Sequence, residues 1–223
     1  EGGPEEDEEE VSISTPLLFY GVQGRDMSED DSPSFYNPVE AAAVRTLIRR
    51  LLDSTEYGVS TNDIGVIAPY RKQVQKIRLL LRKENLGAVR VGTVDDYQGQ
   101  EERVIIISTT LSNSERLNTE SESSLGFLSN ERRFNVAVTR ATSLCIIVGN
   151  PYLMMERSHW KALMQHCVDR KAYAGCPGPL KRRDTHEQDN DMLDEAAEMD
   201  ALSQLVSEHL LGGGGGQEWG HRS

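Results

Sequence analysis

The sequence predicts an α/β domain in which helices cover both faces of a mainly parallel sheet. The first observation is a pair of almost continuously apolar segments, RVIIISTT at 103–110 and SLCIIVGN at 143–150. Strands of this kind are buried on both faces, as in parallel sheets. The second observation is that apolar segments alternate with segments whose apolar residues recur at helical spacing, which is the order of elements in α/β folds.

The first half of the predicted domain contains two strands and two helices. We expect a strand at 17–22, a polar loop at 24–37, a helix at 38–53, a strand at 63–70 and a helix at 71–85. Pro38 directly after Asn37 marks the start of the first helix, because proline fits the first helical position and asparagine caps helix N-termini. The apolar stripe of this helix consists of Val44, Leu47, Ile48, Leu51 and Leu52.

The second half adds three strands and one helix. The strands are expected at 88–94, 103–110 and 143–150, and the helix at 158–170. Between the last two strands, Phe134, Val136 and Val138 alternate along the chain, which on its own suggests a further short strand.

Charge divides the 223-residue chain into a basic centre and two acidic ends. Residues 1–15 carry seven acids and no base, and residues 184–223 carry ten acids and one arginine. Because the whole chain has a net charge of -12, residues 16–183 carry +4. We expect the acidic ends to be disordered and solvated; the alternative is that they screen the basic centre from nucleic acid.

Several classes of protein are excluded or disfavoured. No run of 18 apolar residues exists, so we expect no membrane span, and the acidic start is unlike a signal peptide.

The lack of an initiating Met suggests a fragment of a longer chain. Three cysteines without CxxC spacing predict reduced thiols and a cytoplasmic setting, and they show no zinc spacing with the histidines, so no metal site is expected.

The chain also lacks the phosphate-binding sequence G-x-x-x-x-G-K-[ST]. The pentaglycine at 212–216 has neither the lysine nor a preceding strand. Asp95 and Asp96 follow a strand, but a tyrosine comes next rather than the context of Mg²⁺-holding acids. We therefore predict that this chain alone does not hydrolyse a nucleoside triphosphate.

Ligands of parallel sheets bind at the carboxyl ends of the strands. That rule points to the loop after Val22, to APYRKQ, to GTVDDYQGQE and to the turn after Val148. In GTVDDYQGQE, Gly92 and Gly99 allow a ligand to approach the backbone closely, and Thr93 offers a hydroxyl to a nucleic-acid phosphate. A polar cluster of Gln98, Gln100 and Glu101 follows. The alternative is a loop whose polar side chains satisfy one another.

In IAPYRKQ, an aromatic residue and a base come directly after a strand. Tyr70 could stack on a base ring, and Arg71 could meet a phosphate. The alternative is that Tyr70 packs against the helix start and Arg71 is solvated.

In RRFNVAVTRA, the arginines at 132, 133 and 140 lie in a short and otherwise apolar segment. Arginine is costly to bury unless an anion meets it. Each could pair with a local acid such as Glu131, or the segment could meet a triphosphate presented from outside.

Together, VIAPYRKQ, GTVDDYQGQE and RRFNVAVTRA resemble motifs IV, V and VI of superfamily 1 helicases in order and separation. GFLSNERRFNVAVTRA and the trailing IIVGNP resemble the Upf-like RNA helicase group. HWKALMQHCVDRKAYAGCPGP is similar to the Armitage-type RNA-silencing helicases, the Mov-ten branch. The resemblance covers roughly residues 17 to 180.

This resemblance implies a three-layer, second RecA-like domain at 16–180, between an acidic segment at 1–15 and an acidic, glycine-rich tail at 181–223. A partner domain with the phosphate loop and the Mg²⁺-binding acids would lie upstream, with ATP between the two domains. Further implied partners are single-stranded RNA and proteins of RNA silencing or decay. The implied activity is ATP-driven 5′-to-3′ unwinding.

The resemblance also implies roles for single residues. Arg140 is the expected arginine finger on the γ-phosphate of ATP, lying at the carboxyl edge of the sheet near Tyr70 and Glu101. Tyr70 would stack on adenine, and Glu101 would meet the ribose hydroxyls. Further implied ATP contacts are Arg71, at a position where relatives vary, and the loop residues Gln98 and Gly99. Thr93 and Asp95 would contact RNA.

Two alternatives remain open at this point. The chain could belong to a DNA helicase of the same superfamily, or it could be a RecA-like module kept for protein contacts without turnover. Retention of Tyr70, Gln98, Glu101 and Arg140 argues against the second alternative, because a degenerate motor has no need of them.

Overall fold

A computed structural model describes residues 15–29, 34–55, 57–114 and 128–180. The predicted acidic segment at 1–15, except Thr15, and the predicted tail at 181–223 lie outside these residues. The elements below therefore belong to the predicted domain at 16–180.

A six-stranded sheet forms the middle layer, and every pair of neighbouring strands in it is parallel. Its strands, in spatial order, are β5 (Arg90–Gly92), β4 (Ile64–Ile67), β6 (Glu102–Ser108), β7 (Ala141–Gly149), β1 (Leu17–Gly21) and β8 (Tyr173–Gly175). The central strands β6 and β7 are the two continuously apolar segments, and Ile105, Ile106 and Ile147 within them are fully buried. The prediction of a mainly parallel sheet is confirmed.

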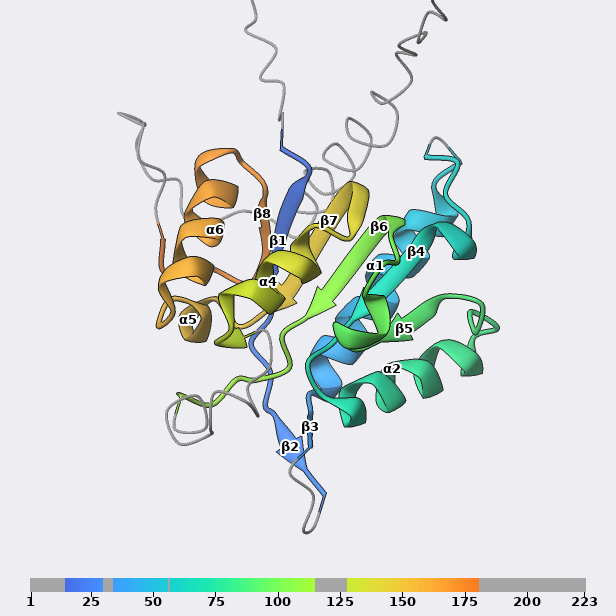
Figure 1. Ribbon diagram of the computed structural model, residues 1–223, viewed down its shortest axis with the longest axis horizontal. Helices are drawn as coiled ribbons and strands as arrows, with labels where there is room; N and C mark the ends of the chain where they lie inside the picture. Colours follow the sequence, from blue (N-terminus) through green and yellow to red (C-terminus); the bar gives the residue numbers. More distant parts are fainter. Residues whose placement is uncertain (1–14, 30–33, 56, 115–127, 181–223) are drawn as a thin grey trace, which may run out of the picture.

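Helices cover both faces of this sheet. Helix α4 (Glu131–Val138) crosses in front of β6 and β7, whereas α1 (Pro38–Asp53) lies behind them (Figure 1). Helix α2 (Arg71–Lys83) packs with α1, and α6 (Ser158–Asp169) packs with β1 and β8. The short helices are α5 (Pro151–Met154), η1 (Thr61–Asp63) and η2 (Asp95–Tyr97). This is the three-layer arrangement expected of a RecA-like domain.

The start of α1 follows the sequence signal. The side chain of Asn37 accepts hydrogen bonds from the backbone N–H groups of Val39 and Glu40, and Pro38 is the first helical residue. These bonds satisfy donors that have no partner within the helix.

Two predictions of local structure are wrong, and one strand was missed. Phe134, Val136 and Val138 lie in helix α4 and not in a strand, because Asn130 caps a helix start there and Phe134 and Ala137 bury one helical face. The loop predicted at 24–37 contains two short antiparallel strands, β2 (Met27–Ser28) and β3 (Phe35–Tyr36). Strand β8, in a short segment after α6, was not predicted.

All three cysteines are free thiols, and Cys145 is buried in β7 as a core side chain. In the described part of the chain, no helix is long and apolar enough to cross a lipid bilayer.

Candidate functional site

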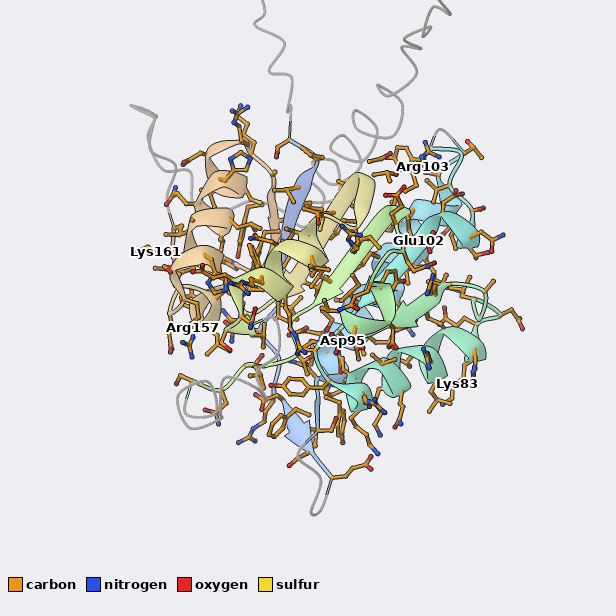
Figure 2. All side chains as sticks on the ribbon, viewed as in Figure 1. Lys83, Asp95, Glu102, Arg103, Arg157 and Lys161 are labelled. Carbon is orange, nitrogen blue, oxygen red and sulfur yellow. The ribbon has the colours of Figure 1, made fainter. Side chains whose placement is uncertain are left out.

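The residues predicted to bind ATP or RNA lie at two opposite edges of the sheet. Tyr70 and Arg71 follow the carboxyl end of β4, and Thr93 and Asp95 follow that of β5. Glu101 and Arg140, in contrast, directly precede β6 and β7, at the amino edge. Figure 2 shows Asp95 and Glu102 at opposite ends of β6.

The expectation that Arg140 lies at the carboxyl edge near Tyr70 and Glu101 is therefore wrong in part. Arg140 lies near Glu101 but on the other edge from Tyr70. The reason is the direction of the chain: α4 returns from the carboxyl edge to the amino edge, and Arg140 comes after it and before β7.

At the amino edge, two backbone carbonyls and one hydroxyl hold the Arg140 side chain. Its Nε donates to the carbonyl of Val136 at 3.0 Å, near the C-terminal end of α4. Its Nη2 donates to the Thr139 hydroxyl at 3.1 Å, and Nη1 reaches the Gln100 carbonyl at 3.5 Å. In the ranges that the structure covers, no carboxylate lies within ion-pair distance of this guanidinium.

The neighbouring loop presents exposed polar groups to the same edge. Gln98, Gly99 and Glu101 are exposed, and Gly99 has φ +71, a left-handed conformation that favours glycine. The Gln100 side chain accepts a hydrogen bond from Arg90 Nη1 at 2.8 Å, which fixes the loop against β5. We call Gly99, Gln100, Glu101 and Arg140 the amino-edge cluster.

At the carboxyl edge, the turn after β5 is closed by Asp96. One oxygen of its carboxylate accepts the backbone N–H of Thr93 at 2.8 Å and the Thr93 hydroxyl at 2.9 Å. The backbone N–H of Thr93 lowers the pKa of Asp96 most, followed by the hydroxyl of the same residue. Asp95 points instead toward α4, with Oδ1 3.6 Å from Arg133 Nη2.

The two residues of the predicted motif IV differ in exposure. The Tyr70 side chain is only 5% exposed, and the Phe35 and Tyr70 rings meet edge to face at 5.3 Å, so the Tyr70 ring is part of the core. Adenine stacking by Tyr70 has no support in this arrangement, which matches the alternative that Tyr70 packs at the helix start. Arg71 is exposed at the first position of α2.

The arginines at 132 and 133 do not pair with Glu131 in the described structure. Arg133 pairs with Asp95, and Arg132 is exposed.

A buried polar network behind the carboxyl edge was not predicted. The Glu40 carboxylate accepts hydrogen bonds from the Ser108 hydroxyl at 2.6 Å, the Thr110 N–H at 2.8 Å, the Thr109 hydroxyl at 3.3 Å and the Asn37 amide at 3.4 Å. Burial raises the pKa of Glu40 to about 7 against the opposing effect of these hydrogen bonds. The network ties the start of α1 to the end of β6.

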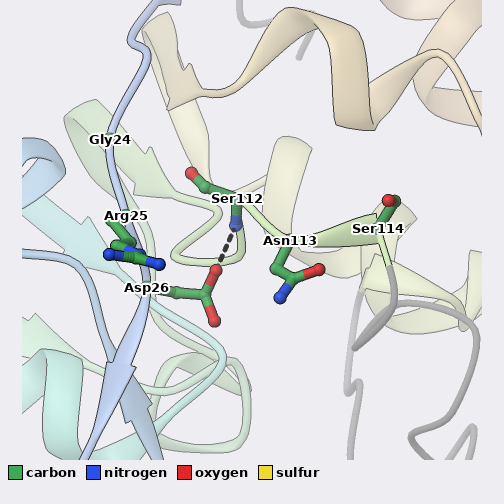
Figure 3. Close-up of a pocket in the computed structure, with 6 residues that line it drawn as sticks. All are labelled: Gly24, Arg25, Asp26, Ser112, Asn113 and Ser114. Carbon is green, nitrogen blue, oxygen red and sulfur yellow. Dashed lines mark hydrogen bonds between the residues drawn. The ribbon is translucent and has the colours of Figure 1, made fainter.

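A polar hollow of about 510 Å³ opens beside this network, between the loops that follow β1 and β6 (Figure 3). Asp26 lies in its wall, 6% exposed, and accepts the Ser112 N–H at 2.9 Å. Its lining residues are Gly24, Arg25, Asp26, Ser112, Asn113 and Ser114. The hollow lies at one of the four predicted places, the loop after Val22. Among the described residues, no group of three or more His, Cys, Asp or Glu side chains is placed to hold a metal ion.

Comparison with known proteins agrees with this architecture. The family model described as "AAA domain" matches residues 4–152. The human "RNA helicase Mov10l1" is 47% identical over 164 residues, covering 74% of this chain and 14% of that protein. "Probable RNA helicase armi" of Drosophila melanogaster is 37% identical over 174 residues, 78% of this chain and 14% of that protein. "DNA polymerase alpha-associated DNA helicase A" of Saccharomyces cerevisiae is 38% identical over 153 residues, 66% and 21% respectively.

The chain thus spans 14% of the length of these two RNA helicases. The family model covers more than half of the chain, and the matching region includes the turn after β5, α4 and Arg140. The chain belongs to the AAA domain family and, within it, to the Upf-like superfamily 1 helicases of the Mov10 and Armitage branch.

Proposed function

We propose that this chain is the second motor domain of an ATP-dependent RNA helicase, with Arg140 as its arginine finger. ATP would lie against the amino-edge cluster, and single-stranded RNA would cross the carboxyl edge. The RNA-helicase names of the human and Drosophila relatives support RNA as the substrate. The 5′-to-3′ direction and partners in RNA silencing or decay rest on the family resemblance, and a cytoplasmic location rests on the cysteine pattern.

The observation that carries this proposal is the state of the Arg140 guanidinium. Its Nε is anchored on Val136 at the end of a helix, whereas Nη1 has only a contact of 3.5 Å to Gln100. No carboxylate of the described residues neutralises its charge. Among the described residues, its nitrogens meet only the neutral oxygens of Val136, Thr139 and Gln100. A guanidinium that is held in place while its charge has no counter-ion suits an anion supplied from outside, such as a γ-phosphate.

The other residues of the amino-edge cluster fit a nucleotide. Glu101 is an exposed carboxylate, which is an acceptor for ribose hydroxyls, and exposed Gly99 permits a close backbone approach. Arg140 would stabilise the negative charge that develops on the transferred phosphoryl group. Mg²⁺ and the phosphate loop would come from an upstream domain, so the 223-residue chain alone should hydrolyse ATP poorly.

At the opposite edge, Thr93 has a backbone N–H and a hydroxyl at the carboxyl end of β5. Such donors contact nucleic-acid phosphates without reading sequence. Asp95 would border the same path. Exposed Arg71, which the resemblance implies as an ATP contact, lies at this edge and away from the amino-edge cluster, so we propose it for the RNA path instead. Because RNA and ATP would bind at opposite edges of one domain, closure of the ATP site would move the residues that contact RNA.

The decisive experiment replaces Arg140 with alanine in the full-length protein. We expect RNA-stimulated ATP hydrolysis to fall by roughly 10³- to 10⁵-fold, the range of arginine fingers. Arg82→Ala, which removes an exposed arginine of α2, is the matched control and should leave the rate unchanged. Unchanged ATPase and unwinding in Arg140→Ala would overturn the proposal and favour a non-catalytic module.

A second arm compares single-stranded RNA with single-stranded DNA as the activator. The yeast relative named as a DNA helicase makes this comparison necessary. Stronger stimulation by RNA is the expected result. Stronger stimulation by DNA would show that the chain belongs to a DNA helicase, in which Arg140 has the same role.

A further inference from the structure

Two segments connect the carboxyl edge of the sheet to its amino edge on the same face. Helix α4 runs from Glu131 to Val138 and delivers Arg140 to the amino edge. The segment at 93–101 begins after β5, continues through η2 and delivers Glu101 to the start of β6. Both segments lie in front of the strands in Figure 1.

The two segments are joined at both ends. At the amino edge, Arg140 Nη1 reaches the Gln100 carbonyl at 3.5 Å, and the Glu102 N–H donates to the Arg140 carbonyl at 3.1 Å. At the carboxyl edge, Arg133 Nη2 lies 3.6 Å from Asp95 Oδ1.

Each segment is also anchored to the fold between these joints. In α4, the Phe134 ring meets the Trp160 ring at 4.7 Å, and Trp160 Nε1 donates to the Leu128 carbonyl at 3.0 Å. In the other segment, Tyr97 is fully buried and its hydroxyl donates to the Arg90 carbonyl at 2.9 Å. These contacts give a continuous physical connection along each segment between the two edges, through which we expect a displacement at one edge to reach the other.

The pair of Arg133 and Asp95 is poorly placed to stabilise the fold. The two side chains are 47% and 59% exposed, and pairs this exposed contribute little to the free energy of unfolding. The pair is well placed, however, to set the position of the turn that holds Thr93 relative to α4.

We infer that Arg133 is a positioning residue that couples RNA binding at the carboxyl edge to Arg140 at the amino edge. This inference rests on the proposed function and adds one step to it. Arg133 does not touch the nucleotide; it holds Asp95, and through Asp95 the RNA-contacting turn, in register with the helix that carries the finger.

The test uses the full-length protein and the variants Arg133→Gln and Arg133→Lys. We measure ATP hydrolysis without RNA and at saturating single-stranded RNA, together with RNA affinity at several salt concentrations. Arg133→Gln should lower the RNA stimulation of ATP hydrolysis at least roughly 5-fold, the lower end of allosteric couplings. Its RNA-free hydrolysis should stay unchanged, and Arg133→Lys should recover most of the stimulation because it keeps the charge.

Two results would overturn the inference. One is unchanged stimulation in Arg133→Gln. The other is a loss of RNA affinity together with a reduction of the salt slope by about one, which identifies a direct phosphate contact. Arg140→Ala separates this failure from that of the proposed function. If Arg140→Ala abolishes hydrolysis while Arg133→Gln is silent, only the coupling is wrong.

Discussion

One carboxylate oxygen of Asp96 accepts hydrogen bonds from both the backbone N–H and the hydroxyl of Thr93, at 2.8 and 2.9 Å. These are the two donors that would contact an RNA phosphate. The turn after β5 thus holds its own carboxylate at the place where we propose that a phosphate oxygen binds, and the two anions would compete.

Asp96→Asn should therefore bind single-stranded RNA more tightly. Asparagine retains a side-chain oxygen for the turn and removes one negative charge from the path of the phosphates. We expect a gain of roughly 2- to 5-fold, from about 0.5–1 kcal/mol of repulsion across 4–8 Å of water. Fluorescence anisotropy with labelled RNA measures it. Asp53→Asn, at the exposed end of α1, is the control. Unchanged or weaker binding of Asp96→Asn would leave Asp96 as a brace of the turn.

Gly65→Ala should destabilise the domain, because the added methyl group would collide with Tyr97 of η2. A Cβ atom at position 65 would come within 2.5 Å of the Tyr97 hydroxyl and 2.7 Å of Ile105 Cδ1. Both side chains are fully buried, so neither has room to yield. Overpacking of this kind costs about 1–3 kcal/mol. Urea denaturation of the 223-residue chain gives the free energy of unfolding. Gly87→Ala, whose Cβ would come no nearer than 3.4 Å to a neighbour, is the control. Equal midpoints for the two variants would contradict the prediction.

The sheet could be predicted from the sequence because β6 and β7 are apolar almost throughout. The edges were harder to assign. A strand was expected from the alternation of Phe134, Val136 and Val138, yet three residues are too few to separate a period of 2 from one of 3.6. Because helix α4 was not predicted, the sequence did not show that the chain returns to the amino edge before Arg140. Arg140 was therefore expected at the carboxyl edge.

The buried network could not be predicted for a different reason. Glu40 lies in the first turn of α1, where a carboxylate is favourable on the helix surface as well. Nothing in its sequence neighbourhood distinguishes an exposed glutamate from one that accepts hydrogen bonds from Ser108 and Thr110, 68 and 70 positions away. Tyr70 is similar: an aromatic side chain after a strand fits a ligand site and a core equally well.

Glu40 should make the stability of the chain depend on pH between about 4.5 and 7. Burial raises its pKa from 4.5 to about 7, so the native state keeps a proton that the unfolded state loses. This extra proton stabilises the native state fully below pH 4.5, and the stabilisation is lost as the pH rises to about 7. The free energy of unfolding should fall by up to about 3 kcal/mol over this range. Glu40→Gln has no such titration. Urea denaturation at pH 5 and pH 7.5 measures the change in each protein.

The difference between the wild type and Glu40→Gln isolates this effect. Burial lowers the pKa of His159, which makes the protein more stable as the pH rises and so acts in the opposite direction. This contribution is common to both proteins and cancels. Parallel pH profiles for the two would contradict the prediction, because they would show that Glu40 binds no more protons in the native state than in the unfolded state.

Trp160 should be the most costly aromatic side chain to remove from the α4 face of the sheet. It is fully buried, it packs edge-on against Phe134 at 4.7 Å, and its Nε1 donates to the Leu128 carbonyl. Trp160→Ala should reduce the free energy of unfolding by about 3–5 kcal/mol, because it leaves a cavity beneath the start of α4. Trp160→Phe should cost less: it keeps a ring against Phe134, and His159 Nε2 still lies 3.2 Å from the Leu128 carbonyl.

Tyr152→Ala is the control. It removes an aromatic side chain that is 49% exposed and should change the free energy of unfolding by about 0.5 kcal/mol or less. If urea denaturation gave the same midpoint for Trp160→Ala and Tyr152→Ala, α4 would not depend on this aromatic contact for its position.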